Sequence, residues 1–358
     1  MMYQLIQRIF IVIFVFFFTV FAWASTDIPN GLLPVERDNI AVFKRISPFV
    51  VNVHNMRTTV NPFFDMNGVQ QQGVGSGFIW NDKGYVVTNY HVIQGAERLA
   101  VTLQNGKTIQ AKMVGIEPRK DIAVLKLVST KELRHLLSIS TFPVADSSKI
   151  QVGQNAIAIG NPFGLNSTLT TGVVSAIDRS VLGVGSVTIY GMIQTDASIN
   201  PGNSGGPLLD SDARLIGMNT VIYSNSGAST GVGFAIPSNT IKNVVEQLIQ
   251  YGHINMPGLG FQPLSDQVAD QLGIQGVVIA KVLPNTPAAN ANLQGIYRDS
   301  YGHLRLGDVI VSVNGRAIKN YDDLYHAMSK LKIGEEVAVM IARNGKRFRV
   351  KLHTINIG

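Results

Sequence analysis

The chain has 358 residues, 46% of them hydrophobic and 15% charged, a composition typical of globular rather than disordered proteins. It contains no cysteine, which excludes disulfides and a cysteine nucleophile or metal ligand. The formal net charge is +7, but the basic residues are scattered. Their densest run, residues 343–351, alternates with apolar side chains as the solvent-facing side of a strand does. This pattern favours an ordinary protein surface over a nucleic-acid or membrane-binding patch.

The first 24 residues have the features of a secretory signal peptide. Arg8 precedes an apolar stretch over residues 9–23, and Ala22 and Ala24 form an A-x-A cleavage site. The apolar stretch is shorter than the roughly 20 residues that a membrane-spanning helix needs. We therefore expect cleavage after Ala24, with an uncleaved inner-membrane anchor as the alternative. Either way, the rest of the chain would lie outside the cytoplasm.

The next part of the chain, residues 25–255, is predicted as one mainly β domain. Residues 25–45 resemble a polar lead-in, and from Val50 to about Pro237 short apolar segments alternate with Gly, Asn and Asp, which indicates a barrel or sandwich. Strand candidates are 85–88, 101–103, 109–116 and 122–127. A helix over 239–251, with Ser238 as its N-cap, is predicted to end this domain because its apolar residues recur with helical spacing.

The last region, residues 256–358, is predicted as a compact α/β domain that follows a linker at 256–258. Strand candidates are 276–282, 309–313, 337–343 and 348–352, and an Asn344-Gly345 turn joins the last two. One helix is predicted over 321–331, with Asn320 as its cap.

A glycine-rich string around Ser204 is the strongest chemical signal in the sequence. It reads G-N-S-G-G-P-L over residues 202–208. A serine hydroxyl attacks a carbonyl when a base takes its proton and hydrogen-bond donors stabilise the oxyanion. Neighbouring glycines allow the tight turn that points backbone N–H groups at the reacting carbonyl. We therefore predict Ser204 as a nucleophile and the N–H groups of Gly202 and Ser204 as its oxyanion hole.

Two other motifs supply candidates for the base and the acid. His91 follows the strand over 85–88, and Asp121 precedes the apolar strand over 122–127, where a buried carboxylate is costly without a partner. A histidine base needs an acid that fixes its tautomer and stabilises its charged form. Each residue alone has an ordinary interpretation, but His91, Asp121 and Ser204 in this order predict a chymotrypsin-like catalytic triad. No histidine has metal-ligand spacing, and acyl transfer through a catalytic triad requires no cofactor, so we expect neither a metal nor an organic cofactor.

Further strings along the first domain carry a family resemblance. They are G-S-G-F-I at 75–79, I-G-N-P-F-G at 159–164, T-G-V-V-S at 171–175, Q-T-D-A at 194–197 and G-V-G-F-A-I-P at 231–237. Together with the three catalytic motifs, they make the chain resemble the HtrA/Deg family of ATP-independent serine proteases. The resemblance implies a chymotrypsin-like double β-barrel for residues 25–255.

The second domain resembles a PDZ domain. Gly258, Leu259, Gly260 and Phe261 match the carboxylate-binding loop, whose N–H groups capture a peptide C-terminus while the peptide pairs as an extra strand. The strings L-G-D-V-I at 306–310 and V-N-G at 313–315 match later PDZ strands and a turn. The alternative is that the glycine-rich segment is only a linker.

The resemblance also implies a specificity and a set of partners. Family members cleave after small aliphatic residues such as Val or Ala; Ser198 occupies the place of the acidic group that trypsin-type cleavage needs, although nearby Asp196 keeps that possibility open. Residues 178–186 and 222–230 match activation loops. The family implies a homotrimer or larger assembly, C-terminal peptides as PDZ ligands, and unfolded or damaged envelope proteins of a Gram-negative periplasm as substrates. Alternatives are a regulatory protease that cuts one membrane-bound protein and a chaperone-like binder of misfolded chains.

Overall fold

The computed structural model describes residues 31–60, 67–133, 141–162, 164, 167–183, 187–200, 202–220 and 231–358, with side chains omitted for 58–60 and 67–74. The predicted signal peptide and the predicted activation loop at 222–230 lie outside the described residues. Among the helices of the described part, none combines the length and the apolar character needed to cross a membrane.

A helix, α2, covers Pro34–Ile46, within the segment that the sequence predicted only as a polar lead-in. Proline is favoured in the first helical turn because it has no N–H to leave unpaired. Glu36 lies in the first turn and accepts a hydrogen bond from the N–H of Leu33 at 2.6 Å, while Lys44 and Arg45 complement the helix dipole in the last turn. These end signals favour a helix in this segment.

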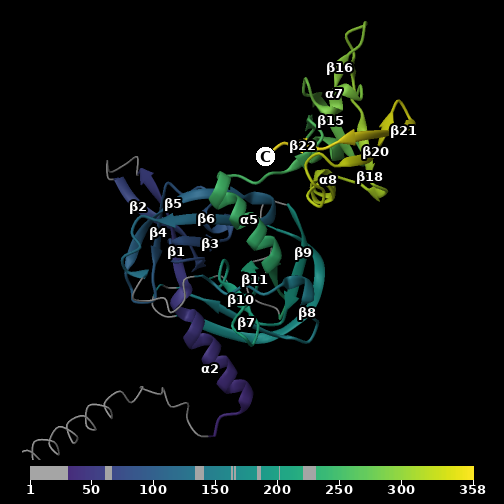
Figure 1. Cartoon of the computed structure of the whole chain (residues 1–358). Helices are drawn as coiled ribbons and strands as arrows, with labels where there is room; N and C mark the ends of the chain where they lie inside the picture. Colours follow the sequence, from purple (N-terminus) through teal and green to yellow (C-terminus); the bar gives the residue numbers. More distant parts are fainter. Residues whose placement is uncertain are drawn as a thin grey trace, which may run out of the picture. The chain divides into compact units, whose positions relative to one another are not determined.

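The first domain consists of two closed, antiparallel six-stranded barrels (Figure 1). The first barrel contains β1 (Val50–Val60), β2 (Asn67–Ile79), β3 (Tyr85–Thr88), β4 (Arg98–Thr102), β5 (Thr108–Glu117) and β6 (Ile122–Leu127). The second contains β7 (Asn155–Gly160), β8 (Thr168–Leu182), β9 (Thr188–Thr195), β10 (Pro207–Leu209), β11 (Leu215–Thr220) and β12 (Gly233–Pro237). This confirms the predicted mainly β, double-barrel fold. Closure of each barrel leaves it no unpaired edge strand.

Helix α5, Ser238–Tyr251, packs against β5 and β6 of the first barrel and β11 and β12 of the second (Figure 1). Its buried face contains Ile241, Val244, Val245 and Leu248, as the helical spacing predicts. Ser238 is the first helical residue rather than the N-cap, because its hydroxyl donates to the carbonyl of Ala145 at 2.7 Å instead of capping the helix.

The C-terminal domain contains an antiparallel sheet in the order β14 (Phe261–Pro263), β15 (Val277–Val282), β18 (Val309–Val313), β20 (Glu336–Arg343) and β21 (Lys346–His353), with β19 (Arg316–Ala317) beside β18. Its helices are α6 (Asp266–Gln271), α7 (Pro287–Asn290) and α8 (Tyr321–Met328). The side chain of Asn320 caps α8, as predicted, by accepting from the N–H of Asp323. A two-stranded ribbon, β16 (Tyr297–Arg298) and β17 (Leu304–Arg305), extends from the domain.

The predicted linker is partly a strand of this domain. Pro257–Gly258 forms β13 and pairs with β22, Ile355–Asn356, and both residues of β13 are buried. The prediction missed this strand because its partner lies at the other end of the domain sequence.

Candidate active site

His91 and Asp121 meet because the strands that precede and follow them are neighbours. His91 lies in the short helix α3 (Tyr90–Ile93) just after β3, Asp121 lies just before β6, and β3 and β6 pair in the first barrel. The Nδ1 atom of His91 lies 2.8 Å from Oδ2 of Asp121, and its backbone N–H donates to Oδ1 at 3.0 Å. The carboxylate can therefore fix both the orientation and the tautomer of the imidazole.

A third donor reaches the same carboxylate from the second barrel. The hydroxyl of Thr220, at the end of β11, donates to Oδ2 of Asp121 at 2.8 Å, and Asp121 is only 6% exposed. A buried carboxylate requires such partners to remain charged. The sequence analysis missed Thr220, because a threonine at the end of a strand carries no motif.

Ser204 lies on a tight turn between β9 and β10. The N–H groups of Asn203, Gly205 and Gly206 donate to the carbonyls of Asn200, Asn219 and Asn203 at 2.9–3.0 Å. The N–H groups of Gly202 and Ser204 donate no hydrogen bond to any described residue. Gly202 has φ +109°, a conformation that side-chain-bearing residues rarely adopt. Among the described residues, the turn therefore leaves without an acceptor the two donors that the sequence predicted as an oxyanion hole.

The side chain of Ser204 makes no hydrogen bond to the imidazole of His91 in this structure. Its Oγ atom is buried and has no hydrogen-bond partner among the described residues, although its backbone carbonyl accepts from the N–H of Ser76 at 2.8 Å. Next to it, a Cβ on Gly205 would lie 2.5 Å from the hydroxyl of Thr88, three residues before His91. The turn thus packs against the end of β3, the strand that leads into His91. Catalytic hydrogen bonds commonly tighten only in the substrate complex.

The two residues weighed for specificity make backbone contacts. Oδ1 of Asp196 accepts from the N–H of Val173 at 2.6 Å, so its carboxylate bonds to β8, while the carbonyl of Ser198 accepts from the Thr170 hydroxyl. Beside them, Ile199 is buried, and a Cβ on Gly233 would lie 2.5 Å from its Cγ1. An aliphatic side chain therefore fills the space next to Gly233.

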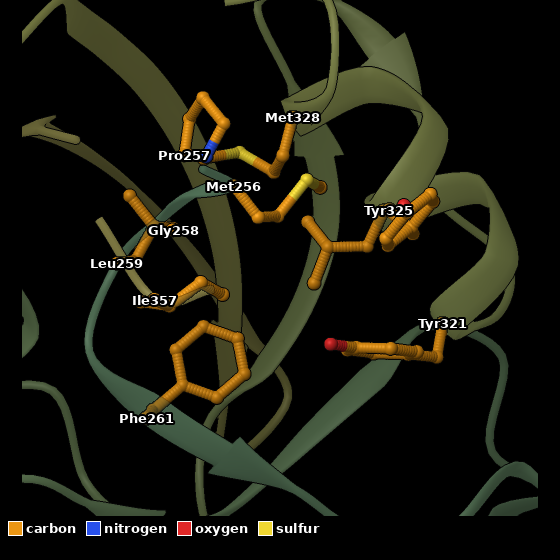
Figure 2. A pocket seen from close by; sticks show the side chains of 10 residues that line it. Met256, Pro257, Gly258, Leu259, Phe261, Tyr321, Tyr325, Met328 and Ile357 are labelled. Atoms are coloured by element: carbon orange, nitrogen blue, oxygen red, sulfur yellow. The ribbon is translucent and has the colours of Figure 1, made fainter. Parts of the chain in front are cut away.

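The C-terminal domain contains an apolar pocket at the glycine-rich loop (Figure 2). It is lined by Met256, Pro257, Gly258, Leu259, Phe261, Tyr321, Leu324, Tyr325, Met328 and Ile357. Figure 2 shows Phe261 and Ile357 on one side of the pocket and the tyrosines of α8, Tyr321 and Tyr325, on the other. The pocket thus lies between β14 and α8.

Backbone donors are available at the edge of this pocket. The carbonyls of Leu259 and Gly260 accept from Ala288 and Leu283 at 3.0 Å, whereas their N–H groups donate to no described residue. Gly260 has φ +85°, and a Cβ there would lie 2.2 Å from Cβ of Thr286. The loop therefore depends on glycine, and these two N–H groups, which have no partner among the described residues, can donate hydrogen bonds to a carboxylate.

Comparison with known proteins assigns both domains. Residues 75–218 match the trypsin-like peptidase domain family, and residues 257–354 match the PDZ domain family. The chain is 45% identical over 326 residues to Protease Do-like 1, chloroplastic, of Arabidopsis thaliana, an alignment that covers 90% of this chain and 73% of the relative. The chain belongs to the HtrA/Deg family of serine proteases. It is a serine endopeptidase with one PDZ domain.

Other members of the HtrA/Deg family agree with this assignment. The periplasmic serine endoprotease DegP of Escherichia coli K12 is 40% identical over 294 residues, which cover 80% of this chain and 58% of DegP. Among solved structures, the HtrA-type protease AlgW with a decapeptide matches with a TM-score of 0.62 at 30% identity and covers 89% of this chain and 99% of that chain.

Proposed function

We propose that this HtrA/Deg protease degrades unfolded or damaged envelope proteins without ATP, with Ser204 as nucleophile, His91 as general base and acid, and Asp121 as the residue that orients His91. One arrangement carries the proposal: His91 and Asp121 are joined by two hydrogen bonds, and the unpaired N–H groups of Gly202 and Ser204 flank the serine. Each component of an acyl-transfer site is therefore available.

The proposed reaction follows from these positions. His91 takes the proton of Ser204 Oγ as that oxygen attacks the peptide carbonyl, and the resulting imidazolium is stabilised by Asp121. The carbonyl oxygen, now negative, accepts from the N–H groups of Gly202 and Ser204. His91 then gives its proton to the leaving amine, and water, activated by the same histidine, hydrolyses the acyl-enzyme.

We infer a preference for small aliphatic residues before the scissile bond. Ile199, an aliphatic residue, is buried beside Gly233, and the carboxylate of Asp196 accepts a hydrogen bond from the backbone of β8. A specificity site lined by such an aliphatic side chain would favour short apolar residues and disfavour lysine or arginine. Sequencing of the fragments that the purified protein produces from unfolded casein would test this inference. Cleavage mainly after basic residues would contradict it.

We propose that the PDZ pocket binds peptides through a free C-terminal carboxylate and an apolar last residue. The two unpaired N–H groups of Leu259 and Gly260 and the apolar lining support this ligand. A labelled peptide ending in valine should bind measurably by fluorescence anisotropy, and its C-terminal amide should bind at least about tenfold more weakly. Equal affinity of acid and amide would exclude carboxylate recognition.

We infer a periplasmic location and a homotrimeric or larger assembly from family membership and from the predicted signal peptide at residues 1–24. Relatives are named as periplasmic and as chloroplastic, so the location depends on the fate of that segment. N-terminal sequencing of the mature protein would distinguish cleavage after Ala24 from retention as an anchor. Light scattering on the purified protein would distinguish a trimer from other assemblies.

Digestion of unfolded casein by the purified mature protein tests the central proposal. Wild-type protein and Ser204→Ala are compared without ATP, and intact folding of the variant is verified by its melting temperature. Degradation by wild type alone is expected. Equal degradation by both proteins would exclude Ser204 as nucleophile.

The alternative roles have distinct outcomes in the same experiment. If neither protein degrades casein, even when the valine-ending peptide is added, a chaperone-like function would replace the degradative one. If wild type cleaves one folded envelope protein but not casein, a regulatory, site-specific protease would replace it.

A further inference from the structure

A hydroxyl group from the first barrel reaches the loop that carries the proposed oxyanion hole. Ser76 lies on β2 and is fully buried. Its Oγ donates to the backbone carbonyl of Gly202 at 2.5 Å and accepts from the backbone N–H of Asn161 at 2.7 Å. A serine hydroxyl can donate one hydrogen bond and accept others. That of Ser76 donates to Gly202 and accepts from Asn161 at the same time.

Asn161 is itself held from the first barrel. It follows β7 of the second barrel, is fully buried, and its carbonyl accepts from the side-chain amide of Asn52 at 2.6 Å. Asn52 and Ser76 are paired opposite each other on β1 and β2. These two neighbours therefore bind the carbonyl and the N–H of Asn161, so its backbone is fixed at both polar groups.

The turn at Gly202 rests on the residue that follows Asn161. A Cβ on Gly202 would lie 2.3 Å from Cβ of Pro162, so the two backbones are in close contact. Ser76 thus bonds to both sides of this contact, to Asn161 on one side and to Gly202 on the other.

The bond to Ser76 completes the restraint on one peptide unit of the turn. The carbonyl of Gly202 and the N–H of Asn203 belong to the same peptide, and that N–H donates to the carbonyl of Asn200 at 3.0 Å. Glycine has little intrinsic preference among its backbone conformations, so contacts with other segments decide which one it adopts. This restrained peptide lies between the two peptides that carry the N–H groups of Gly202 and Ser204, so the bonds at its two ends restrain the turn next to both donors.

We propose that Ser76 is a positioning residue for the oxyanion hole, which holds the Gly202 turn in its competent conformation through a hydrogen bond that crosses from the first barrel to the second. This inference rests on the proposed roles of Gly202 and Ser204. Ser76 does not touch the reacting atoms; it acts through the backbone of Gly202. Its loss should affect the transition state, in which the oxyanion exists, far more than the binding of substrate.

Ser76→Ala tests this role against a merely structural one. Ser238→Ala is the matched control, because it removes another buried hydroxyl that donates to a backbone carbonyl at 2.7 Å, that of Ala145. Rates on casein are measured for wild type, both variants and Ser204→Ala, and inhibition is measured with a peptidyl boronic acid that carries a valine side chain beside the boron. The boronate becomes tetrahedral on the serine and so mimics the intermediate.

We expect Ser76→Ala to lower kcat about 10- to 100-fold, with KM changed less than about twofold. The affinity for the boronate should fall by a factor similar to that for kcat. Ser238→Ala should lose thermal stability but keep kcat per folded molecule. Ser76→Thr, which keeps the hydroxyl, should recover at least part of the kcat lost in Ser76→Ala.

Two results would separate the possible failures. If Ser76→Ala keeps kcat and boronate affinity per folded molecule, as Ser238→Ala does, the hydroxyl is structural only and the inference is wrong while Ser204→Ala remains inactive. If Ser204→Ala is as active as wild type, the proposed function itself fails, whatever Ser76→Ala does.

Discussion

The two barrels of the protease domain provide different halves of the proposed site. The first barrel holds His91 just after β3 and Asp121 just before the paired strand β6, in direct hydrogen-bond contact. The second holds Ser204 on a glycine-rich turn in which Gly202 and Gly205 have positive φ. Each half also receives a hydroxyl from the opposite barrel: Thr220 donates to Asp121, and Ser76 donates to Gly202.

The difference between the halves follows from what each must hold. The His91–Asp121 pair keeps its geometry if the carboxylate has enough donors, and His91 itself supplies two of them, its backbone N–H and its Nδ1. A glycine turn has many accessible conformations, so contacts from outside the turn must select one. We therefore expect kcat to depend on the hydrogen-bonding groups in the half that contains His91 and Asp121. In the half that contains Ser204, we expect it to depend on the position of the backbone.

Asp121→Asn should have the largest effect. Three donors converge on this carboxylate, and an amide has only one acceptor oxygen, so at least one donor must face an N–H group. We expect kcat to fall about 10⁴-fold, because His91 is then held in the wrong tautomer. Initial rates on casein would measure this, with the melting temperature as control. A loss below tenfold would remove Asp121 from its proposed role.

Gly202→Ala should have the next largest effect. A Cβ would strain the φ of +109° and meet Pro162 at 2.3 Å, so the turn must move. We expect kcat to fall about 10²- to 10³-fold, as when an oxyanion donor is lost. Gly153→Ala is the control, since it has φ +89° and no atom within 4 Å of its Cβ. Equal kcat for the two variants would show that an alanine at Gly202 causes only backbone strain and does not disturb the oxyanion hole.

Thr220→Val should reduce kcat roughly tenfold, since it removes one buried hydrogen bond to a charged group and leaves two. Thr220→Ser retains the hydroxyl and should stay within about twofold of wild type. A normal rate for Thr220→Val would mean that the two donors from His91 suffice to hold the carboxylate, and that the contact from the second barrel contributes nothing to catalysis.

The smallest expected effect is a pH dependence of the free energy of unfolding that comes from His54 in the first barrel. Partial burial lowers the pKa of His54 below its usual 6.5, and its Nε2 lies 2.7 Å from the hydroxyl of Thr102. The unfolded chain therefore binds this proton more readily, so the free energy of unfolding contributed by neutral His54 is present above pH 6.5 and is lost as the pH falls through the lowered pKa.

Urea unfolding of wild type and His54→Gln between about pH 7 and pH 5 would measure this contribution. We expect the stability of His54→Gln to fall less steeply with decreasing pH than that of wild type. Identical slopes would contradict the assignment of this proton uptake to His54.

Local sequence signals located most elements of the fold. The strand predicted over 122–127 has the same bounds in the structure, and the helix predicted over 239–251 differs by one residue at its start. Alternating or continuous apolar runs set these elements directly. The predicted linker over 256–258 was wrong in part, because β13 exists only through its pairing with Ile355–Asn356.

The sequence by itself determined the fold class, the two domains and the motifs that carry His91, Asp121 and Ser204, because these depend on apolar periodicity and on short strings of neighbouring residues. Only the tertiary structure decided that Thr220 bonds to Asp121 and Ser76 to Gly202, pairs separated by 99 and 126 positions. A single serine or threonine on a strand carries no local signal of its partner. Its role arises when the barrels pack together and a buried hydroxyl must find an acceptor.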